Sequence, residues 1–318
     1  MKKLIVTILA LSIALTAAGG IAAAAVNLSI GTASLGGNFF TMGAVIAETI
    51  TNKTEYQATA QATGGSAVNV DLVHNGEVDM AICQASAVSV AVRGLEQFAG
   101  SPITDVRTLV NWNATPIHIM ARRSIGAANI TELVSSSIEC ITPGDGIEIT
   151  TKMIFKAVGM SFDDAKIEHS GNRVQSASRF KTSGVDAIFD GTGIGAAWIT
   201  DIIGDGSVFE LLSLTDDQIE KIIAGAPEMT KMVIPAGTYK GQDKDVVTVG
   251  NWTSLISHEK MSEEVAYNIT KSIIENKEDL VKGHNFFRDL LPQNIIDACD
   301  APLHPGAEKY YKEIGILK

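Results

Sequence analysis

Positive charge is scarce in this sequence. Its 318 residues include 25 lysines and arginines against 36 acidic residues, for a formal net charge of −11. Nucleic-acid binding needs a basic surface, so this balance excludes nucleic acid as a partner, and it argues against an anionic membrane surface. A small anionic ligand stays possible, because it interacts with a local site rather than with the net charge of the protein. Charged residues make up 19% and hydrophobic residues 46% of the chain, which excludes a disordered protein.

Cysteine and the common catalytic motifs are also scarce. Cys83, Cys140 and Cys299 are isolated and odd in number, so we expect buried small side chains rather than a disulfide framework. The chain lacks G-x-x-x-x-G-K-[ST], G-x-S-x-G and H-E-x-x-H, and its six histidines have no ligand spacing. We therefore expect no metal, no cofactor and no enzymatic activity.

The N-terminus is typical of an export signal. A basic start at residues 1–3 precedes an apolar run at residues 4–15 and small residues at 23–25. This pattern predicts a cleavable signal peptide over residues 1–25 and a periplasmic, extracytoplasmic location. The alternative is an uncleaved membrane anchor, because the apolar segment is long enough to span a bilayer.

Short apolar strands then alternate with helices in two series, which predicts parallel sheets covered by helices. Residues 75–82 and 183–188 share one pattern, in which a glycine and Val-Asp lead into an apolar strand. The repetition indicates two similar α/β lobes rather than one continuous sheet.

Two strands are expected to connect the lobes, at residues 116–123 and 246–258. The predicted boundaries are a signal peptide at 1–25, lobe I at 26–118 with 250–318, and lobe II at 119–249. Residues 262–282 have helical spacing and many charges, which predicts one long surface helix on lobe I.

Glycine-rich turns recur between strand and helix, at residues 34–38, 63–66, 144–146 and 191–193. Each turn places main-chain N–H groups at a helix N-terminus, where they bind carboxylate or phosphate. One such turn is explained by turn geometry alone. Four of them, at matching strand ends, predict a cleft that binds an anion, because ligands of open α/β sheets lie at the carboxyl ends of strands.

Four side chains near these turns have two interpretations each. Ser66 is expected to cap a helix rather than act as a nucleophile, because no partner histidine is identifiable. Asp190 either binds a ligand amine or caps the next helix. Arg122 or Arg123 either reaches the cleft to pair with a ligand carboxylate or is a surface charge near the hinge.

Five segments, taken together, resemble the TAXI group of extracytoplasmic solute receptors of TRAP transporters. They are residues 30–40 (IGTASLGGNFF), 62–69 (ATGGSAVN), 76–84 (GEVDMAICQ), 234–239 (IPAGTY) and 302–311 (PLHPGAEKYY). The resemblance implies a two-lobed periplasmic-binding-protein-like α/β fold (type II-like) with a strand-pair hinge. It also implies delivery of a small organic anion, such as glutamate, glutamine or a dicarboxylate, to a sodium-coupled TRAP permease.

The resemblance also implies a set of ligand-binding residues in the turns of both lobes. They are Ser34, Gly36, Gly37, Asn38, Phe39, Gly65, Ser66, Gln84, Gly144, Asp145, Gly146, Asp190, Gly191 and Thr192.

The chain departs from the family pattern in both lobes. In lobe I, the family usually has Thr at Leu35, Tyr at Phe39 and Phe40, and Asp at Ser86. In lobe II, the turn at residues 144–147 reads Gly-Asp-Gly-Ile, where the family usually has Gly-Ser-Gly-Thr. Asp145 repels a ligand carboxylate unless it faces away or meets an ammonium group.

Two other functions stay open. One is a receptor that feeds an ATP-driven (ABC) importer or a sensor kinase. The other is a periplasmic hydrolase of small esters or amides, against which the missing nucleophile–base pair argues.

Overall fold

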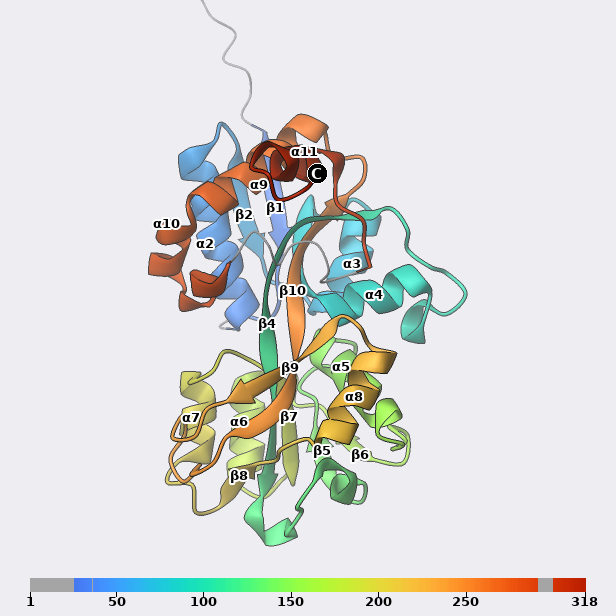
Figure 1. The fold of residues 1–318 in the computed structure, drawn as a ribbon, viewed down its shortest axis with the longest axis vertical. Helices are drawn as coiled ribbons and strands as arrows, with labels where there is room; N and C mark the ends of the chain where they lie inside the picture. Colours follow the sequence, from blue (N-terminus) through green and yellow to red (C-terminus); the bar gives the residue numbers. More distant parts are fainter. Residues whose placement is uncertain (1–25, 36, 291–299) are drawn as a thin grey trace, which may run out of the picture.

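The computed structural model describes residues 26–35, 37–290 and 300–318. The predicted signal peptide, Gly36 and Cys299 lie outside these ranges. Figure 1 shows two lobes stacked along the long axis, with the strands β4 (Val106–Arg122) and β10 (Val246–His258) running through both. None of the helices in the described ranges is both long enough and apolar enough to cross a membrane.

Lobe I is the upper lobe of Figure 1 and contains both ends of the described chain. Its strands β1, β2 and β3 are parallel to one another, and β3 pairs antiparallel with β10. Besides parts of β4 and β10, its elements are β1 (Asn27–Gly31), α2 (Asn38–Lys53), β2 (Gln57–Gln61), α3 (Ser66–His74), β3 (Met80–Gln84), α4 (Ala85–Arg93), α9 (Glu263–Glu275), α10 (Lys277–Gly283) and α11 (Pro305–Glu313).

Lobe II repeats this plan with a second parallel group, in which β5 pairs with β6 and β7. Its elements are β5 (Ser137–Glu139), α5 (Gly146–Ala157), β6 (Lys166–Glu168), α6 (Arg173–Lys181), β7 (Ala187–Gly191), α7 (Ala197–Ile203), β8 (Phe209–Leu211), α8 (Asp216–Gly225) and β9 (Met229–Ile234).

The strands of both lobes form one hydrogen-bonded sheet, so the prediction of two separate sheets is wrong. The strand order is β2-β1-β3-β10-β4-β7-β5-β6, with β8 paired to β4 and β9 paired to β10. The sheet is continuous because the predicted crossing at 116–123 is the end of one long strand, β4, which begins at Val106 in lobe I. The predicted return at residues 246–258 is confirmed. The β4–β10 register shifts between Asn251 and Thr253, where the strands cross from lobe to lobe.

The sequence repeat corresponds to the same local interaction in each lobe. In lobe I, the Asp79 carboxylate accepts hydrogen bonds from the main-chain N–H and the hydroxyl of Ser29. In lobe II, the Asp186 carboxylate accepts the same two hydrogen bonds from Ser137. The repeated Val-Asp dipeptide therefore joins two neighbouring parallel strands in each lobe, which confirms that the lobes are similar.

Each lobe has its own apolar core. Ile46 and Trp112 are fully buried in lobe I, as are Phe155 and Phe189 in lobe II. Burial of one such side chain contributes about 1.5–3 kcal/mol. A third apolar cluster joins the lobes, because Ile149 of α5 packs among buried residues of lobe I. Cys83 and Cys140 are also buried, as predicted.

The predicted helix at residues 262–282 is two helices, because the chain breaks at Asn276 between α9 and α10. The backbone of Asn276 has φ −105° and ψ 30°, and both its main-chain N–H and its side-chain amide donate to the Ser272 carbonyl.

Candidate functional site

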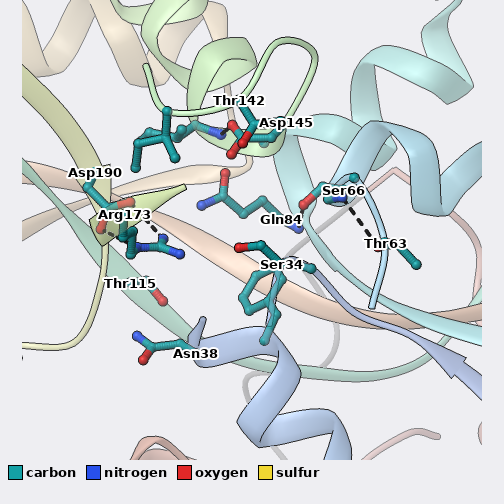
Figure 2. Close-up of a pocket in the computed structure, with 18 of the residues that line it drawn as sticks. Ser34, Asn38, Thr63, Ser66, Gln84, Thr115, Thr142, Asp145, Arg173 and Asp190 are labelled. Atoms are coloured by element: carbon teal, nitrogen blue, oxygen red, sulfur yellow. Dashed lines mark hydrogen bonds and ion pairs between the residues drawn. The ribbon is translucent and has the colours of Figure 1, made fainter. Parts of the chain in front are cut away.

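A cavity of about 180 Å³ lies between the lobes, at the carboxyl ends of their parallel strands. Its volume is below the roughly 300–1,000 Å³ of pockets for drug-sized ligands, which limits it to a small metabolite. Figure 2 shows Ser34, Asn38 and Ser66 of lobe I facing Asp145, Arg173 and Asp190 of lobe II, with Gln84 between them.

The lobe I wall consists of helix N-termini that point at the cavity. The N-cap residues of α2, α3 and α4 are Gly37, Gly65 and Gln84, and none of the three caps its helix with a side chain among the described residues. Gly65 has φ 104°, a conformation that favours glycine. Helices α2 and α3 therefore present main-chain N–H groups whose partial positive charge suits a carboxylate. In α4, the N–H groups of Gln84 and Ser86 donate to Ser66 and Asn251 instead.

Polar side chains complete the lobe I wall. The Ser66 hydroxyl accepts a hydrogen bond from the main-chain N–H of Gln84 at 3.0 Å, so its own hydrogen is available for a ligand. Thr63 also lines the cavity, and its hydroxyl donates to Asn69. The buried Asn69 amide in turn donates to the carbonyls of Thr32 and Ile82, which fixes the ends of two strands at the cavity.

The lobe II wall differs because a carboxylate caps its helix. Asp145 accepts hydrogen bonds from the main-chain N–H groups of Ile147 and Glu148, at 2.8 and 3.1 Å, and so occupies the N-terminus of α5. Burial raises the pKa of the Asp145 carboxyl to about 7. Asp145 lines the cavity and does not face away from it.

Arg173 places a positive charge at the lobe II wall and is paired with the buried Asp190. The Arg173 guanidinium donates to both carboxylate oxygens of Asp190, at 2.8 Å from Nη2 and 3.2 Å from Nε. The Asp190 side chain is fully buried, and burial raises the pKa of its carboxyl. Asp190 thus pairs with an arginine, whereas the sequence left open a ligand amine or a helix cap.

The sequence did not single out Arg173, although it follows a Gly-Asn turn at a strand end. The sequence left open whether Arg122 or Arg123 reaches the cleft or is a surface charge near the hinge, and neither lines the cavity, so the first alternative is wrong. The Arg122 guanidinium donates to the carbonyl of Val185 and lies over two aromatic rings, while Arg123 forms an ion pair with Glu210 at 2.9 Å.

A strained residue lies beside the arginine. Ile141 lines the cavity with φ 67°, an uncommon conformation for a β-branched residue. Its N–H donates to the buried carboxylate of Glu139, and its carbonyl accepts from Gly171 at 2.7 Å. Glu139 also accepts from Ser176 of α6, so one carboxylate positions both the strained turn and the helix that begins with Arg173. Backbone strain of this kind clusters at binding sites.

The lobes are in close contact around the cavity. A Cβ atom on Gly146 would lie 2.5 Å from Oε1 of Gln84, and one on Gly191 would lie 2.9 Å from Nε2 of Gln84. At the rim, the Asn38 amide donates to the Thr192 hydroxyl at 2.8 Å. The two glycines thus let lobe II approach the side chain of Gln84.

Most of the predicted ligand-binding residues line this one cavity. They are Ser34, Asn38, Phe39, Gly65, Ser66, Gln84, Asp145, Gly146, Asp190 and Gly191. Gly37, Gly144 and Thr192 lie beside it without lining it, and Gly36 is outside the described residues. Ligand contact by these residues stays a prediction. Among the described residues, no cluster of His, Cys, Asp or Glu is suited to a metal ion.

Comparison with known proteins places the chain in a family. Residues 30–315 match the NMT1-like family. The chain belongs to this family. Its fold is shared with solved periplasmic proteins at 10–15% sequence identity.

Three of these structures illustrate the likeness of this NMT1-like protein. MatC from Rhodopseudomonas palustris, solved with bound malate, is 11% identical, with a TM-score of 0.56 over 91% of this chain and 96% of that chain. The periplasmic binding protein BugD is 15% identical, with a TM-score of 0.55 over 92% and 98%. The aliphatic sulphonate binding protein SsuA from Escherichia coli is 10% identical, with a TM-score of 0.51 over 90% and 83%. The two-lobed periplasmic-binding-protein fold predicted from the sequence is confirmed.

Proposed function

We propose that this protein is the extracytoplasmic solute receptor of a TAXI-type TRAP transporter. Its ligand is a small organic anion, such as glutamate, glutamine or a dicarboxylate, held in the cavity between the lobes. The observation that carries the proposal is the lobe I wall, where helices α2 and α3 begin at the cavity without a side-chain cap and direct main-chain N–H groups at it. Arg173 adds a positive charge on the lobe II side of the cavity.

The ligand carboxylate binds the N–H groups at the start of α3, together with the hydroxyl of Ser66 and the amide of Gln84. Phe39 packs against the carbon chain and helps to exclude water. Each hydrogen bond to a charged group contributes about 1.5–3 kcal/mol, so three or four of them hold one carboxylate firmly.

Release requires the lobes to separate. Lobe I (residues 26–118 with 250–318) and lobe II (residues 119–249) move about β4 and β10, the two strands that run through both. Hinge motion of this kind is the usual way in which two-lobed receptors open and close. The sodium-coupled permease accepts the ligand from the opened cleft. The malate in the MatC structure supports an organic acid as ligand.

A role as a receptor rather than an enzyme is supported by the family match and by neighbours that are binding proteins. The protein acts in the periplasm after removal of residues 1–25, and the mass of the mature chain from an exporting host tests this directly. Retention of the full-length mass would favour the membrane anchor instead.

The test of the ligand class is calorimetry of the purified protein with glutamate, glutamine, malate, 2-oxoglutarate and a neutral sugar. An acid present at about 100 times its Kd should stabilise the fold by about 2.7 kcal/mol, which is visible as a thermal shift. Binding of the sugar with no binding of any acid would remove this ligand class. Mass spectrometry of co-purified ligand identifies the acid. A TRAP permease encoded beside the receptor favours this transporter, whereas an ATPase or a kinase there favours the alternative receptors.

A further inference from the structure

A buried contact between helices α4 and α5 joins the lobes beside the crossing strand β10. Ser86 belongs to α4 of lobe I, Thr150 to α5 of lobe II and Asn251 to β10, and all three are fully buried. Figure 1 shows α4 just above α5, on the same side of the crossing strands. The β4–β10 register shifts at Asn251, where the strands cross from lobe to lobe, so this α4–α5 contact lies at the hinge.

The hydrogen bonds of the α4–α5 contact are complete without a ligand. The Ser86 N–H can only donate, and it meets Oδ1 of Asn251 at 3.3 Å. Nδ2 of Asn251 therefore donates to the hydroxyls of Ser86 and Thr150, at 2.6 and 2.8 Å. The Thr150 hydroxyl donates to the Gly146 carbonyl at 2.7 Å, so the Ser86 hydroxyl is the donor to Thr150, at 3.1 Å. Every side-chain donor of the three residues is used, which suits the contact equally to the empty and the loaded protein.

Apolar packing and an ion pair extend the contact along α4. Ile149 of α5 packs among buried residues of lobe I, and separation of the helices would return it to water. At the other end of α4, Arg93 pairs with the buried Glu228 of lobe II at 3.3 Å. Glu228 directly precedes β9, whose Met229 pairs with Asn251. The contact therefore joins both lobes to the hinge strand β10.

The turns that line the cavity make a smaller contact between the lobes. Gly65 of lobe I touches Asp145 of lobe II, since a Cβ atom on Gly65 would lie 3.0 Å from that of Asp145. At the rim, the Asn38 amide donates to the Thr192 hydroxyl. Gly65, Asp145 and Asn38 all line the cavity, so these contacts must part before a ligand leaves.

We propose that the α4–α5 contact is the pivot of the hinge: it stays formed while the cleft opens, and the turns that line the cavity swing apart around it. Asp145, the N-cap of α5, lies about 7.5 Å from Thr150 along the helix axis. A rotation of lobe II about Thr150 therefore carries Asp145 away from Gly65 while Thr150 and Ser86 stay together. The inference rests on the opening of the cleft in the proposed function, but not on the identity of the ligand.

Two engineered disulfides test the proposal. Ser86→Cys/Thr150→Cys links the α4–α5 contact, where the two hydroxyl oxygens are 3.1 Å apart. Asn38→Cys/Thr192→Cys links the rim, where the amide nitrogen and the hydroxyl oxygen are 2.8 Å apart. Peptide mapping by mass spectrometry establishes that each disulfide joins the introduced cysteines, and the reduced form of each variant is its control.

Small-angle X-ray scattering of the ligand-free proteins measures the opening. The wild type and the α4–α5 disulfide should have the same radius of gyration, and the rim disulfide should have a smaller one. An α4–α5 disulfide as compact as the rim disulfide would overturn the proposal. A wild type no larger than the rim disulfide would overturn it as well, because the cleft would then not open.

The scattering needs no ligand, so its outcome is independent of the proposed function. If the wild type binds no organic acid in calorimetry, the proposed function fails and the scattering still decides the pivot. If malate binds, its release in stopped-flow measurements gives a second readout. The α4–α5 disulfide should release it within about twofold of the reduced rate, and the rim disulfide more than about tenfold more slowly. Equal slowing by the two disulfides would overturn the proposal.

A single substitution distinguishes a pivot from a contact that forms only on closure. A contact present in the open and the closed protein stabilises both equally, so its loss does not change ligand affinity. Ile149→Ala should lower the midpoint of thermal unfolding but leave the malate affinity within about twofold of the wild type. Ile149→Val, the milder control, should lower the midpoint less. A larger fall in malate affinity in Ile149→Ala would overturn the proposal.

Discussion

The two walls of the cavity are built from similar strand–helix units but offer opposite chemistry. In lobe I, helices α2, α3 and α4 begin without a side-chain cap among the residues that the structure describes. In lobe II, Asp145 caps α5 and Asn172 caps α6. Helices α2 and α3 of lobe I therefore keep their first main-chain donors for a ligand, whereas α5 and α6 of lobe II use theirs internally and lobe II presents side-chain charge instead.

This difference assigns separate tasks to the lobes. In the proposed function, the main-chain donors of lobe I bind a carboxylate of suitable size. Lobe II adds one positive group, Arg173, and two acidic groups, Asp145 and Asp190. We propose that lobe I captures the anion and that the balance of charges on lobe II selects it on closure.

The largest expected effect comes from blocking the approach of the lobes. Gly146→Ala places a methyl group against Gln84 and Ser66. Overpacking of this size costs about 1–3 kcal/mol, so malate or glutamate affinity should fall by about 10- to 100-fold in calorimetry. Gly193→Ala is the matched control, because a Cβ there meets no atom within 4 Å. Unchanged binding by Gly146→Ala would contradict the closed arrangement of the lobes.

The next largest effect is expected from removing Arg173, the positive charge that lobe II places at the cavity. Arg173→Ala should weaken binding of a dicarboxylate by about tenfold, since a charge-assisted hydrogen bond is lost. It should also destabilise the fold by about 2 kcal/mol. This loss is smaller than the one expected on breaking a fully buried ion pair, because the arginine side chain is 28% exposed. The double variant Arg173→Ala/Asp190→Asn should recover stability in thermal unfolding but not affinity. Recovery of both would mean that the arginine does not meet the ligand.

Asp145 tests the selecting role of lobe II. Asparagine also caps helices, so Asp145→Asn should leave stability nearly unchanged while raising the affinity for malate by about fivefold. The pKa of the Asp145 carboxyl is about 7, so the carboxyl is protonated below pH 7 and charged above it. The wild-type affinity for malate should therefore fall as pH rises from 6 to 8.

The asparagine variant is the control for this pH dependence and should show a flatter profile. Glutamate offers an ammonium group to the carboxylate, so its affinity should fall in Asp145→Asn. An identical response of malate and glutamate to the substitution would show that Asp145 only caps the helix.

The smallest effect is expected at the rim of the cleft. Thr192→Val removes the acceptor for the Asn38 amide and should weaken ligand binding by about threefold, whereas Thr192→Ser should not. Faster ligand dissociation in stopped-flow measurements should account for the loss. Equal dissociation rates for the two variants would show that the Asn38–Thr192 hydrogen bond does not help to hold the lobes closed.

The sequence predicted the lobe I wall better than the lobe II wall for a physical reason. A glycine-rich turn before a helix is visible locally, and residues such as Gly65 and Ser66 follow from it. Arg173 depends on partners far along the chain, because it faces the cavity only through its pair with Asp190. Local spacing contains no signal for such a pair.

The overall fold was likewise predictable only where it follows from local sequence patterns. The Val-Asp repeat predicted the similar lobes, since each Asp bonds a nearby strand start. The continuous sheet was missed because it depends on β4 and β10 being long enough to pair in both lobes. The hydrogen bonds that join Ser86, Thr150 and Asn251 between the lobes were missed as well, because isolated Ser, Thr and Asn residues in apolar segments have no recognisable pattern.

The central claim is that the donors of lobe I capture an anion and that lobe II then selects it. A crystal structure of the mature protein with its co-purified ligand tests this most directly. We predict a carboxylate within hydrogen-bond distance of the main-chain N–H groups that begin α3, with Gln84 Nε2 also donating to the ligand. A ligand whose acidic group contacts only Arg173, or one bound outside this cavity, would contradict the account.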